Sequence, residues 1–472
     1  MIPGGDDKPD NILEKTAMDT MTRMKATELA GKDNNKESPL TFNRRYFATF
    51  LFYYIVEGSN NGLFSIFVPV FLIKSGLPGV NEPFILTLAT FTAIPFTIKI
   101  IWGVISDRFP IGHLGRRRPY ISIFIIICGV SWLALIAVLP VVQFLSIGIL
   151  ILLGILINTG AAFSDTALDG LIMDVTPAEK LGRVEGATWA MYSIGGILGG
   201  TLGIFIYVAI GDGTPVFIIF GLLSIACGIV VWILKEPATV TKKLDMTAFK
   251  RLLKGKRNWN GYFFSLATHL PENAVSIMLA LFLLIKIGIL SSGSMGLSLL
   301  FDENLTWYVL AFQLSASGGI VLASALLGKL ADKHNRKKLF GLVVILTLIF
   351  IPLTSVIVVD FISAMIAAFL VGTALGGAST LTMTFVAGIT QENPASTSTH
   401  FSIFTSFMNA GSNIGLALFA VLTGELLDAG IAPTAVYAIA FVIAPLLMLS
   451  SLLFVKGLPS RASASSRGTG EK

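Results

Sequence analysis

The sequence predicts an all-α membrane protein with twelve transmembrane helices, arranged as two pseudo-symmetric six-helix bundles. Of its 472 residues, 54% are hydrophobic and 13% are charged, whereas charged residues make up roughly 25% of an average soluble domain. Apolar runs long enough to cross the ~30 Å hydrocarbon core of a bilayer recur along most of the chain. Backbone groups in lipid must be hydrogen bonded within the chain, so runs of this length are expected to be helical.

Six apolar runs come before a long polar stretch, and six come after it. The expected spans are residues 46–74, 84–106, 119–141, 143–168, 184–211, 214–234, 261–289, 305–331, 338–359, 361–389, 400–424 and 432–456. The polar stretch, KEPATVTKKLDMTAFKRLLKGKRNWN, carries eight lysines and arginines. The predicted parts are therefore a tail at 1–45, a bundle at 46–234, a linker at 235–260, a second bundle at 261–456 and a tail at 457–472.

Lysines and arginines gather in alternate loops and in both tails. Because cytoplasmic loops carry an excess of these residues, the pattern predicts an even number of spans with both termini in the cytoplasm. It also accounts for the formal net charge of +6 without a nucleic-acid partner. The first forty residues contain no apolar core of a cleavable leader. We expect a monomeric, multi-pass protein of the plasma membrane.

A short motif occurs once in each predicted bundle. Residues 103–108 read GVISDR and residues 328–333 read GKLADK, so both fit G-x-x-x-D-[RK]. Each copy ends the second span of its bundle and precedes a basic cluster, GRRRPY in the first case and NRKKLF in the second. A six-span unit duplicated around a site near the membrane midplane is the architecture of many secondary transporters.

The first copy resembles the motif G-x-x-x-D-[RK]-x-G-[RK]-x-[RK]-[RK], which the major facilitator superfamily carries between spans two and three. This resemblance covers about 46–456. The K-x-x-W before the motif and SDTALDGLIMDVTPAEKLGR at 164–183 are similar to muropeptide permeases of the AmpG type and to acetyl-CoA transporters. The segment FPIGHLGRRRPY is similar to folate–biopterin transporters. The arginine triplet also resembles sucrose and glycoside–pentoside–hexuronide symporters, which remain an alternative branch.

The resemblance implies a gate at the cytoplasmic mouth. In this family pattern, Asp107 and Arg108 lock the two bundles together while the inside is shut. Their counterparts in the second copy are expected to close more loosely. The arginines could instead fix the topology and bind anionic lipid headgroups, at ~1 kcal/mol per cation. The expected gate residues are Gly103, Asp107, Arg108, Gly115, Arg116, Arg117, Arg118, Asp332 and Lys333.

Three charged residues lie deeper, on spans two and four. A charge at the bilayer centre costs ~2.5–3.5 kcal/mol on insertion scales, so each needs a partner or a task. Asp165 and Asp169 are four residues apart and share one helix face, at the same depth as Lys99. We expect Lys99 to pair with Asp165 or Asp169. Such a cluster could be a simple gate, could exchange a proton that drives transport, or could contact the solute.

Polar residues also occur near the middle of spans one and seven, which the resemblance places around a central cavity. Hydrogen-bonding groups there are suited to hold a polar solute. The alternative is that they bond neighbouring helices, at ~0.6 kcal/mol each on average. The expected solute-binding residues are Glu57, Asn60 and Asn61 in span one, and His269, Glu272 and Asn273 beside Pro271 in span seven.

Motifs of other functions are absent from the sequence. It contains no P-loop, no H-E-x-x-H and no cysteine pair at metal-binding spacing, so we expect no enzyme activity, cofactor or metal site. The expected function is secondary active transport of a small polar or anionic solute by alternating access, coupled to a proton or, as second choice, to sodium. A sugar–cation symporter, an uncoupled facilitator and a non-transporting scaffold remain alternatives. Membrane lipids are the other expected partners.

Overall fold

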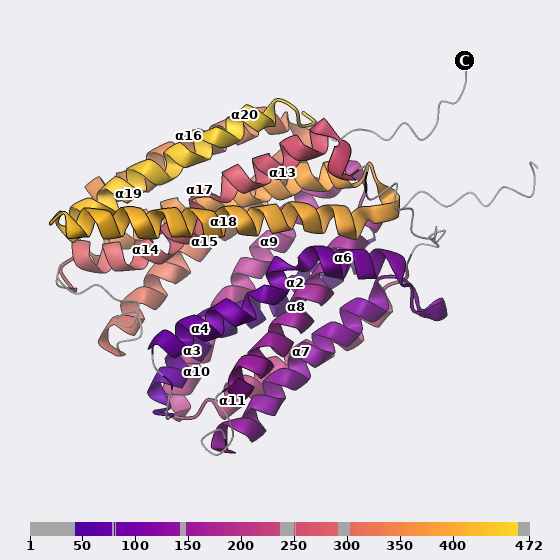
Figure 1. Cartoon of the computed structure of the whole chain (residues 1–472), viewed down its shortest axis with the longest axis horizontal. Coiled ribbons are helices and arrows are strands. Elements are labelled where there is room, and N and C mark those ends of the chain that lie inside the picture. The colour runs from indigo at the N-terminus through magenta and orange to yellow at the C-terminus, as the bar shows by residue number, and fades with distance from the viewer. Residues whose placement is uncertain are drawn as a thin grey trace, which may run out of the picture. The chain divides into compact units, whose positions relative to one another are not determined.

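The computed structural model describes residues 43–77, 80, 82–141, 148–236, 250, 252–290 and 303–460 (Figure 1). All of them belong to one compact unit. Most of the predicted N-terminal tail, most of the linker and the end of the C-terminal tail lie outside the described residues. The boundaries of the five parts therefore remain predictions.

Every element in the described part of the chain is helical, and twelve spans are long and apolar enough to cross a membrane. This confirms the predicted fold class. The elements of the first half are α2 (Arg44–Gly62), α3 (Val68–Lys74), α4 (Glu82–Thr92), α5 (Ile94–Thr97), α6 (Lys99–Arg108), α7 (Arg118–Val138), α8 (Gly148–Val175), α9 (Leu181–Ile197), α10 (Gly203–Ile210) and α11 (Thr214–Val230).

The second half repeats the pattern of six spans. Its longest helices are uninterrupted, whereas its first span is divided by the turn at Leu270 and Pro271. The elements are α13 (Lys256–His269), α14 (Glu272–Lys286), α15 (Glu303–Lys333), α16 (Arg336–Ile357), α17 (Phe361–Thr390), α18 (Thr397–Asp428), α19 (Pro433–Met448) and α20 (Leu452–Val455).

Several spans are interrupted near their middle. A π-helical turn at Leu63–Phe67 separates α2 from α3, and another at Leu198–Leu202 separates α9 from α10. The second span breaks at Ile98, between α5 and α6. Such turns leave local freedom in the backbone hydrogen bonding and occur often at functional sites.

The fourth span differs from its predicted bounds. It was expected to end at residue 168, but α8 continues to Val175. Hydropathy alone ends the span early because Asp169 and Asp174 look like loop residues. Both acids have partners inside the protein, so the helix continues through them.

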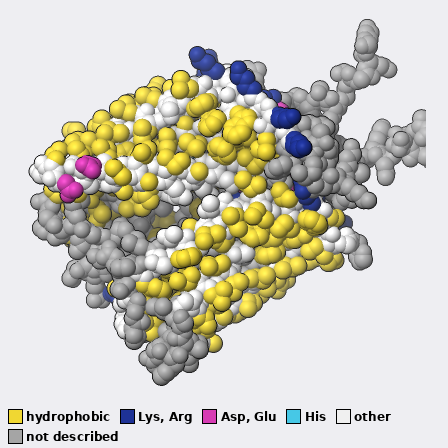
Figure 2. All heavy atoms as spheres, in the orientation of Figure 1, with side chains coloured by type: hydrophobic (Ala, Val, Ile, Leu, Met, Phe, Trp, Pro, Cys, Tyr) yellow, Lys and Arg dark blue, Asp and Glu magenta, His cyan; other side chains and the backbone are white. Residues whose placement is uncertain are grey.

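The two halves contact each other mainly through α9 against α15 and through α18 against α6 and α8. Figure 2 shows lysines and arginines gathered at one end of the molecule, to the right, and a recess between the halves left of centre. We call the end that carries the arginine triplet the basic end. Large apolar side chains such as Leu453 and Val421, 76% and 66% exposed, cover the outer flanks, as a lipid-facing surface requires.

Candidate functional site

Lys99 starts α6 directly after the break in the second span. Pro95 lies at the start of the preceding short helix α5, where its missing backbone N–H is tolerated, and its carbonyl accepts a hydrogen bond from Trp102 Nε1 at 2.9 Å. The Lys99 ammonium bonds Asp165 Oδ2 of α8 and lies 5.3 Å from the centre of the Phe96 ring. Both partners of this ion pair are buried, with 7% and 4% of their surfaces exposed.

Asp169 has a different partner. It lies one helical turn beyond Asp165, and its Oδ1 accepts a hydrogen bond of 2.6 Å from the Tyr54 hydroxyl of α2. Of the two aspartates expected beside Lys99, the structure therefore brings Asp165 into the ion pair and gives Asp169 to Tyr54.

Two further carboxyl groups complete this cluster. Glu57 of α2 is 6% exposed and interacts electrostatically with Asp165, Lys99 and Asp169. Its Oε2 atom has no hydrogen-bond partner among the residues that the structure describes. Glu185 of α9 is 5% exposed and interacts electrostatically with Asp165 and Asp169. Glu185 was missed in the sequence because it lies near the start of its span, next to a basic loop, where charges are usually solvated.

The interior of the spans is strongly unbalanced in charge. The interior is defined as the positions at least six residues from either end of a described span. By this criterion Lys99 is the one lysine or arginine in the described ranges. Five carboxyl groups meet the same criterion, and they are Glu57, Asp165, Asp169, Glu185 and Glu272.

A hollow of about 260 Å³, which includes space open to solvent, lies beside this cluster. Asn61 is exposed and Asn158 partly exposed, so both amides are accessible. The side chains that line the hollow are Glu57, Asn60, Asn61, Phe96, Ile157, Asn158, Ala161 and Tyr192.

Asn60 takes part in the packing of the first half, although it touches this hollow. Its Oδ1 accepts a hydrogen bond of 2.7 Å from Trp132 Nε1 of α7. Its Nδ2 bonds Ser224 Oγ of α11 at 3.1 Å and the Val56 carbonyl at 3.0 Å. With 3% of its surface exposed and its amide engaged, Asn60 has little left to offer a solute.

The expected residues of span seven also differ in how accessible they are. Glu272, at the start of α14, has 27% of its side chain exposed and accepts a hydrogen bond of 2.9 Å from Ser412 Oγ. The partly exposed Asn273 bonds Asn413 at 3.3 Å. His269 is 3% exposed; its Nδ1 lies 2.8 Å from the Ser265 carbonyl oxygen, and its Nε2 lies 3.9 Å from Glu272 Oε2.

Tyr192 interacts with acids of both halves. This tyrosine of α9 lines the hollow and interacts electrostatically with both Glu57 and Glu272. Its ring stacks on Trp189, with centroids 5.2 Å apart and an angle of 11° between the planes. Tyr192 is therefore within electrostatic range of an acid from each half.

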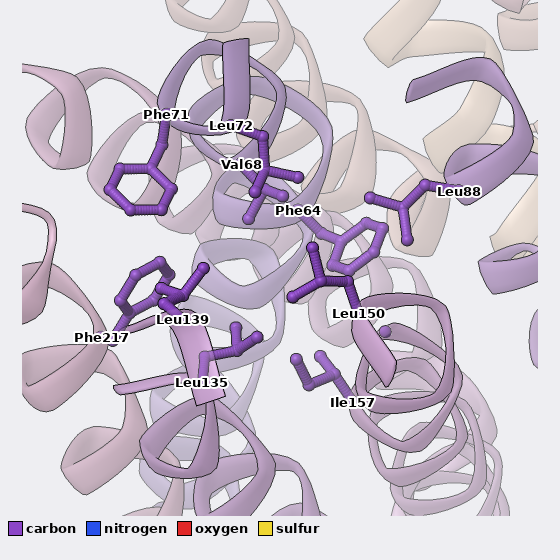
Figure 3. A pocket seen from close by; sticks show the side chains of 11 residues that line it. Phe64, Val68, Phe71, Leu72, Leu88, Leu135, Leu139, Leu150, Ile157 and Phe217 are labelled. Atoms are coloured by element: carbon purple, nitrogen blue, oxygen red, sulfur yellow. The ribbon is translucent and has the colours of Figure 1, made fainter. Parts of the chain in front are cut away.

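A second hollow, of about 340 Å³, lies in the first half and is lined by apolar side chains (Figure 3). In Figure 3, Phe64, Phe217 and Leu135 surround it from different helices. Ile157 belongs to the walls of both hollows. No sequence pattern predicts this apolar space, because the residues around it look like ordinary core.

The gate motif of the first half contacts the start of α18. Asp107 Oδ2 accepts hydrogen bonds from Thr399 N at 2.7 Å and Thr399 Oγ1 at 2.6 Å. A carboxylate at a helix N-terminus interacts favourably with the unpaired N–H groups and the helix dipole. Close packing accompanies this contact, since a Cβ atom on Gly103 would lie 2.5 Å from Ser402 Oγ.

The motif of the second half makes the corresponding contact with α9. Asp332 accepts hydrogen bonds from the N–H groups of Gly182, at 2.7 Å, and Arg183, at 2.9 Å. The two aspartates therefore form reciprocal bridges between the halves at the basic end. Arg108 and Lys333 end α6 and α15 at the same end of the molecule.

The arginine triplet divides its contacts. Arg117 bonds Asp107 at 2.6 Å and Asp174 at 3.2 Å, while Arg116 bonds Asp174 at 2.7 Å. Arg118 reaches the Leu234 carbonyl at 2.8 Å.

Glu236, just after the sixth span, accepts hydrogen bonds from the backbone N–H groups of all three arginines. Gly115 makes room for it, with φ of 115° and no side chain to meet the Glu236 carboxyl group. This cap could not be predicted, because Glu236 and the arginine triplet are far apart in the chain.

Comparison with known proteins defines the family. The sequence pattern of the Major Facilitator Superfamily matches residues 46–405. The chain belongs to this superfamily. It is therefore a multi-pass membrane transport protein rather than an enzyme, as expected from the sequence.

Curated relatives of this superfamily member include plant proteins. It is similar to the "Probable folate-biopterin transporter 7" of Arabidopsis thaliana, with 31% identity over 153 residues, 31% of this chain and 33% of the relative. "Probable folate-biopterin transporter 4" of the same plant is 32% identical over 123 residues, 25% of this chain and 24% of the relative. The matches thus span a third or less of these relatives.

Solved structures of transporters share its fold. The transporter FucP in the outward conformation aligns with a TM-score of 0.62 and 13% identity, over 86% of this chain and 99% of that one. The human organic anion transporter MFSD10 aligns with a TM-score of 0.64 and 12% identity, over 87% of this chain and 99% of that one.

Proposed function

We propose that the protein is a proton-coupled symporter of a small polar solute and works by alternating access. The observation that carries the proposal is the charge balance in the interior of the spans, where five carboxyl groups accompany one ammonium group. Burying a carboxylate without a partner is costly, and a buried acid avoids this by binding a proton. A cluster with more acids than bases is therefore suited to take up and release protons.

The contacts of Asp165 suggest how a proton is linked to the conformational change. Asp165 bonds Lys99 and also interacts electrostatically with Glu57, whose side chain lines the hollow. A solute that binds Glu57 changes the surroundings of Asp165 without touching it. We propose that proton exchange occurs in this group of side chains, with Asp169 and Glu185 as its extension along α8 and α9.

The aspartate bridges supply the gate of the proposed cycle. Asp107 holds the start of α18, and Asp332 holds the start of α9, so the basic end is closed in this structure. Release of both bridges would let the halves separate there. We propose that this end faces the cytoplasm, since it carries the excess of lysine and arginine. The plasma membrane and a monomeric state are part of the same proposal.

The solute is proposed to be a pteridine or a compound of similar size and polarity. The support is the names of the plant relatives, which are described as folate-biopterin transporters. Another relative is described as chloroplastic, so localisation of a fluorescent fusion in the native cell is the test of the proposed membrane.

Uptake by purified protein in lipid vesicles tests the coupling. Biopterin and folate are offered under an imposed pH gradient, under a sodium gradient and under neither. We expect the pH gradient to drive uptake above equilibrium, and Glu57→Gln or Asp165→Asn to abolish that drive. Glu425→Gln, at an exposed carboxyl group outside the cluster, is the matched control. Sodium-driven uptake, or uptake that ignores both gradients, would refute proton symport.

A further inference from the structure

In the described part of the chain, the central hollow has a carboxyl group on its wall and no unpaired lysine or arginine beside it. Glu57 lines it from the first half, and Glu272 of the second half interacts electrostatically with Tyr192, which also lines it. Lys99, the one interior lysine of the described spans, is held by Asp165, and the His269 imidazole lies 3.9 Å from Glu272. An anionic solute would therefore meet a carboxyl group here, and both of these basic side chains already face acids. The charge distribution therefore disfavours the anionic part of the solute class expected from the sequence.

Glu57 also has hydrogen-bonding capacity that the protein does not use. It is 94% buried, and its Oε2 atom lacks a partner in the described part of the structure. A buried acceptor without a donor is unfavourable, so this atom is suited to receive one from a ligand. A carboxylate accepts two parallel N–H donors especially well, because both oxygens are then engaged.

The remaining walls favour a flat ring. Phe96 and Tyr192 line the hollow together with the amides of Asn61 and Asn158. Aromatic faces pack well against planar rings, and amides bond the ring's edge groups.

From these observations we infer that the solute is an uncharged or cationic planar heterocycle with two adjacent N–H donors, which bind the carboxylate of Glu57. The 2-amino-4-oxopyrimidine edge of a pterin carries such a pair. Folate has the same ring but adds a dianionic tail, which this site disfavours. The inference rests on the proposed function, because it assumes that the solute is transported through this hollow.

Equilibrium binding to the full-length protein in detergent tests the inference without any gradient. Thermal stabilisation of the protein by each probe, measured over a range of probe concentrations, reports occupancy. The probes are biopterin, a biopterin analogue with a carbonyl in place of the 2-amino group, folate and fucose. We expect biopterin to bind, and the analogue to bind roughly 10-fold more weakly or worse, as a lost hydrogen bond to a charged group predicts. Folate, which keeps the ring edge, should bind more weakly than biopterin because its dianionic tail meets the acids of this region.

Variants test whether Glu57 is the residue that binds the two N–H donors of the solute. Glu57→Gln should reduce the preference for biopterin over its 2-oxo analogue to near unity, while Glu425→Gln should leave it unchanged. Equal binding of the two pteridines by the unaltered protein, tighter binding of folate, or binding of fucose alone would overturn the inference even if Glu57→Gln fails to fold. Failure of proton coupling is distinguishable, since selective binding would persist when uptake ignores the pH gradient.

Discussion

Lys99 and Asp165 join α6 to α8 through a buried ion pair, close to where the second span is broken. The pair is the positive centre of a group of acids, and Glu57 connects that group to the hollow between the halves. Solute binding and proton binding therefore share one set of side chains. The following predictions test the separate parts of this arrangement.

Removal of one partner of the ion pair should be much worse than removal of both. Lys99→Met leaves Asp165 as an unpaired buried acid, and we expect a loss of ~3–5 kcal/mol in the free energy of unfolding. The double variant Lys99→Met/Asp165→Asn should regain most of that loss but not proton-driven uptake. Thermal unfolding in detergent and vesicle uptake measure the two effects. Equal stability of the single and double variants would contradict the claim that an unpaired Asp165 is costly.

Asn60 and Asn61 should behave in opposite ways although they are adjacent. Asn60→Ala leaves Trp132 and Ser224 without their partner and should destabilise the protein by ~1–3 kcal/mol. Asn61→Ala removes an exposed amide from the hollow and should weaken solute binding with little effect on the unfolding temperature. The same two measurements on both variants decide the matter. A stability loss in Asn61→Ala and not in Asn60→Ala would reverse the roles assigned here.

The aspartate bridges should hold the basic end shut. Asp107→Asn weakens the contacts with Thr399 and Arg117, and Asp332→Asn weakens those with Gly182 and Arg183. We expect either change to expose a cysteine introduced by Ser402→Cys, a buried position on α18, to a water-soluble thiol reagent. The native Cys128 and Cys227 are buried and should contribute little background.

The expected rise in labelling rate is roughly 10-fold for each bridge, from the loss of hydrogen bonds to a charged group. Glu425→Gln in the same Ser402→Cys background is the control for removal of an acid elsewhere. Unchanged labelling in both bridge variants would mean that other contacts close this end.

Close approach of α6 and α18 should depend on Gly103. An alanine Cβ there would lie 2.5 Å from Ser402 Oγ and 2.9 Å from the Ser398 carbonyl oxygen, so the helices must move apart. Gly103→Ala should lengthen the distance between spin labels at the basic ends of α6 and α18. Gly341→Ala, at a helical glycine with open space around it, is the control and should change nothing. An unaltered distance distribution in Gly103→Ala would contradict the tight contact.

The fold was predictable because bilayer thickness fixes the length of each apolar run, and loop cations follow membrane topology. The pairing of Lys99 with Asp165 was predictable for a similar reason, since interior charges are few and must find each other. Depth along a helix can be read from the sequence, but rotation about its axis cannot. This is why Asn60 was expected at the cavity, although its amide bonds Trp132 and Ser224 inside the bundle.

Contacts between residues far apart in the chain were the other feature that the sequence could not predict. Tyr54 of α2 bonds Asp169 of α8, and Glu236 caps the arginine loop from the far end of the first half. Neither contact leaves a pattern of spacing, because the two sides are more than a hundred residues apart. Glu185 was overlooked since its position near a span end resembles that of a solvated charge, yet the structure buries it.

Direct measurement of proton movement tests the central claim most sharply. Vesicles that contain the protein and a trapped pH indicator, with equal pH on both sides, receive external biopterin. We predict that solute entry acidifies the lumen, that Asp165→Asn stops the acidification, and that Glu425→Gln preserves it. Entry of the solute at an undiminished rate with no change in lumenal pH would contradict the claim that the acids around Lys99 couple transport to protons.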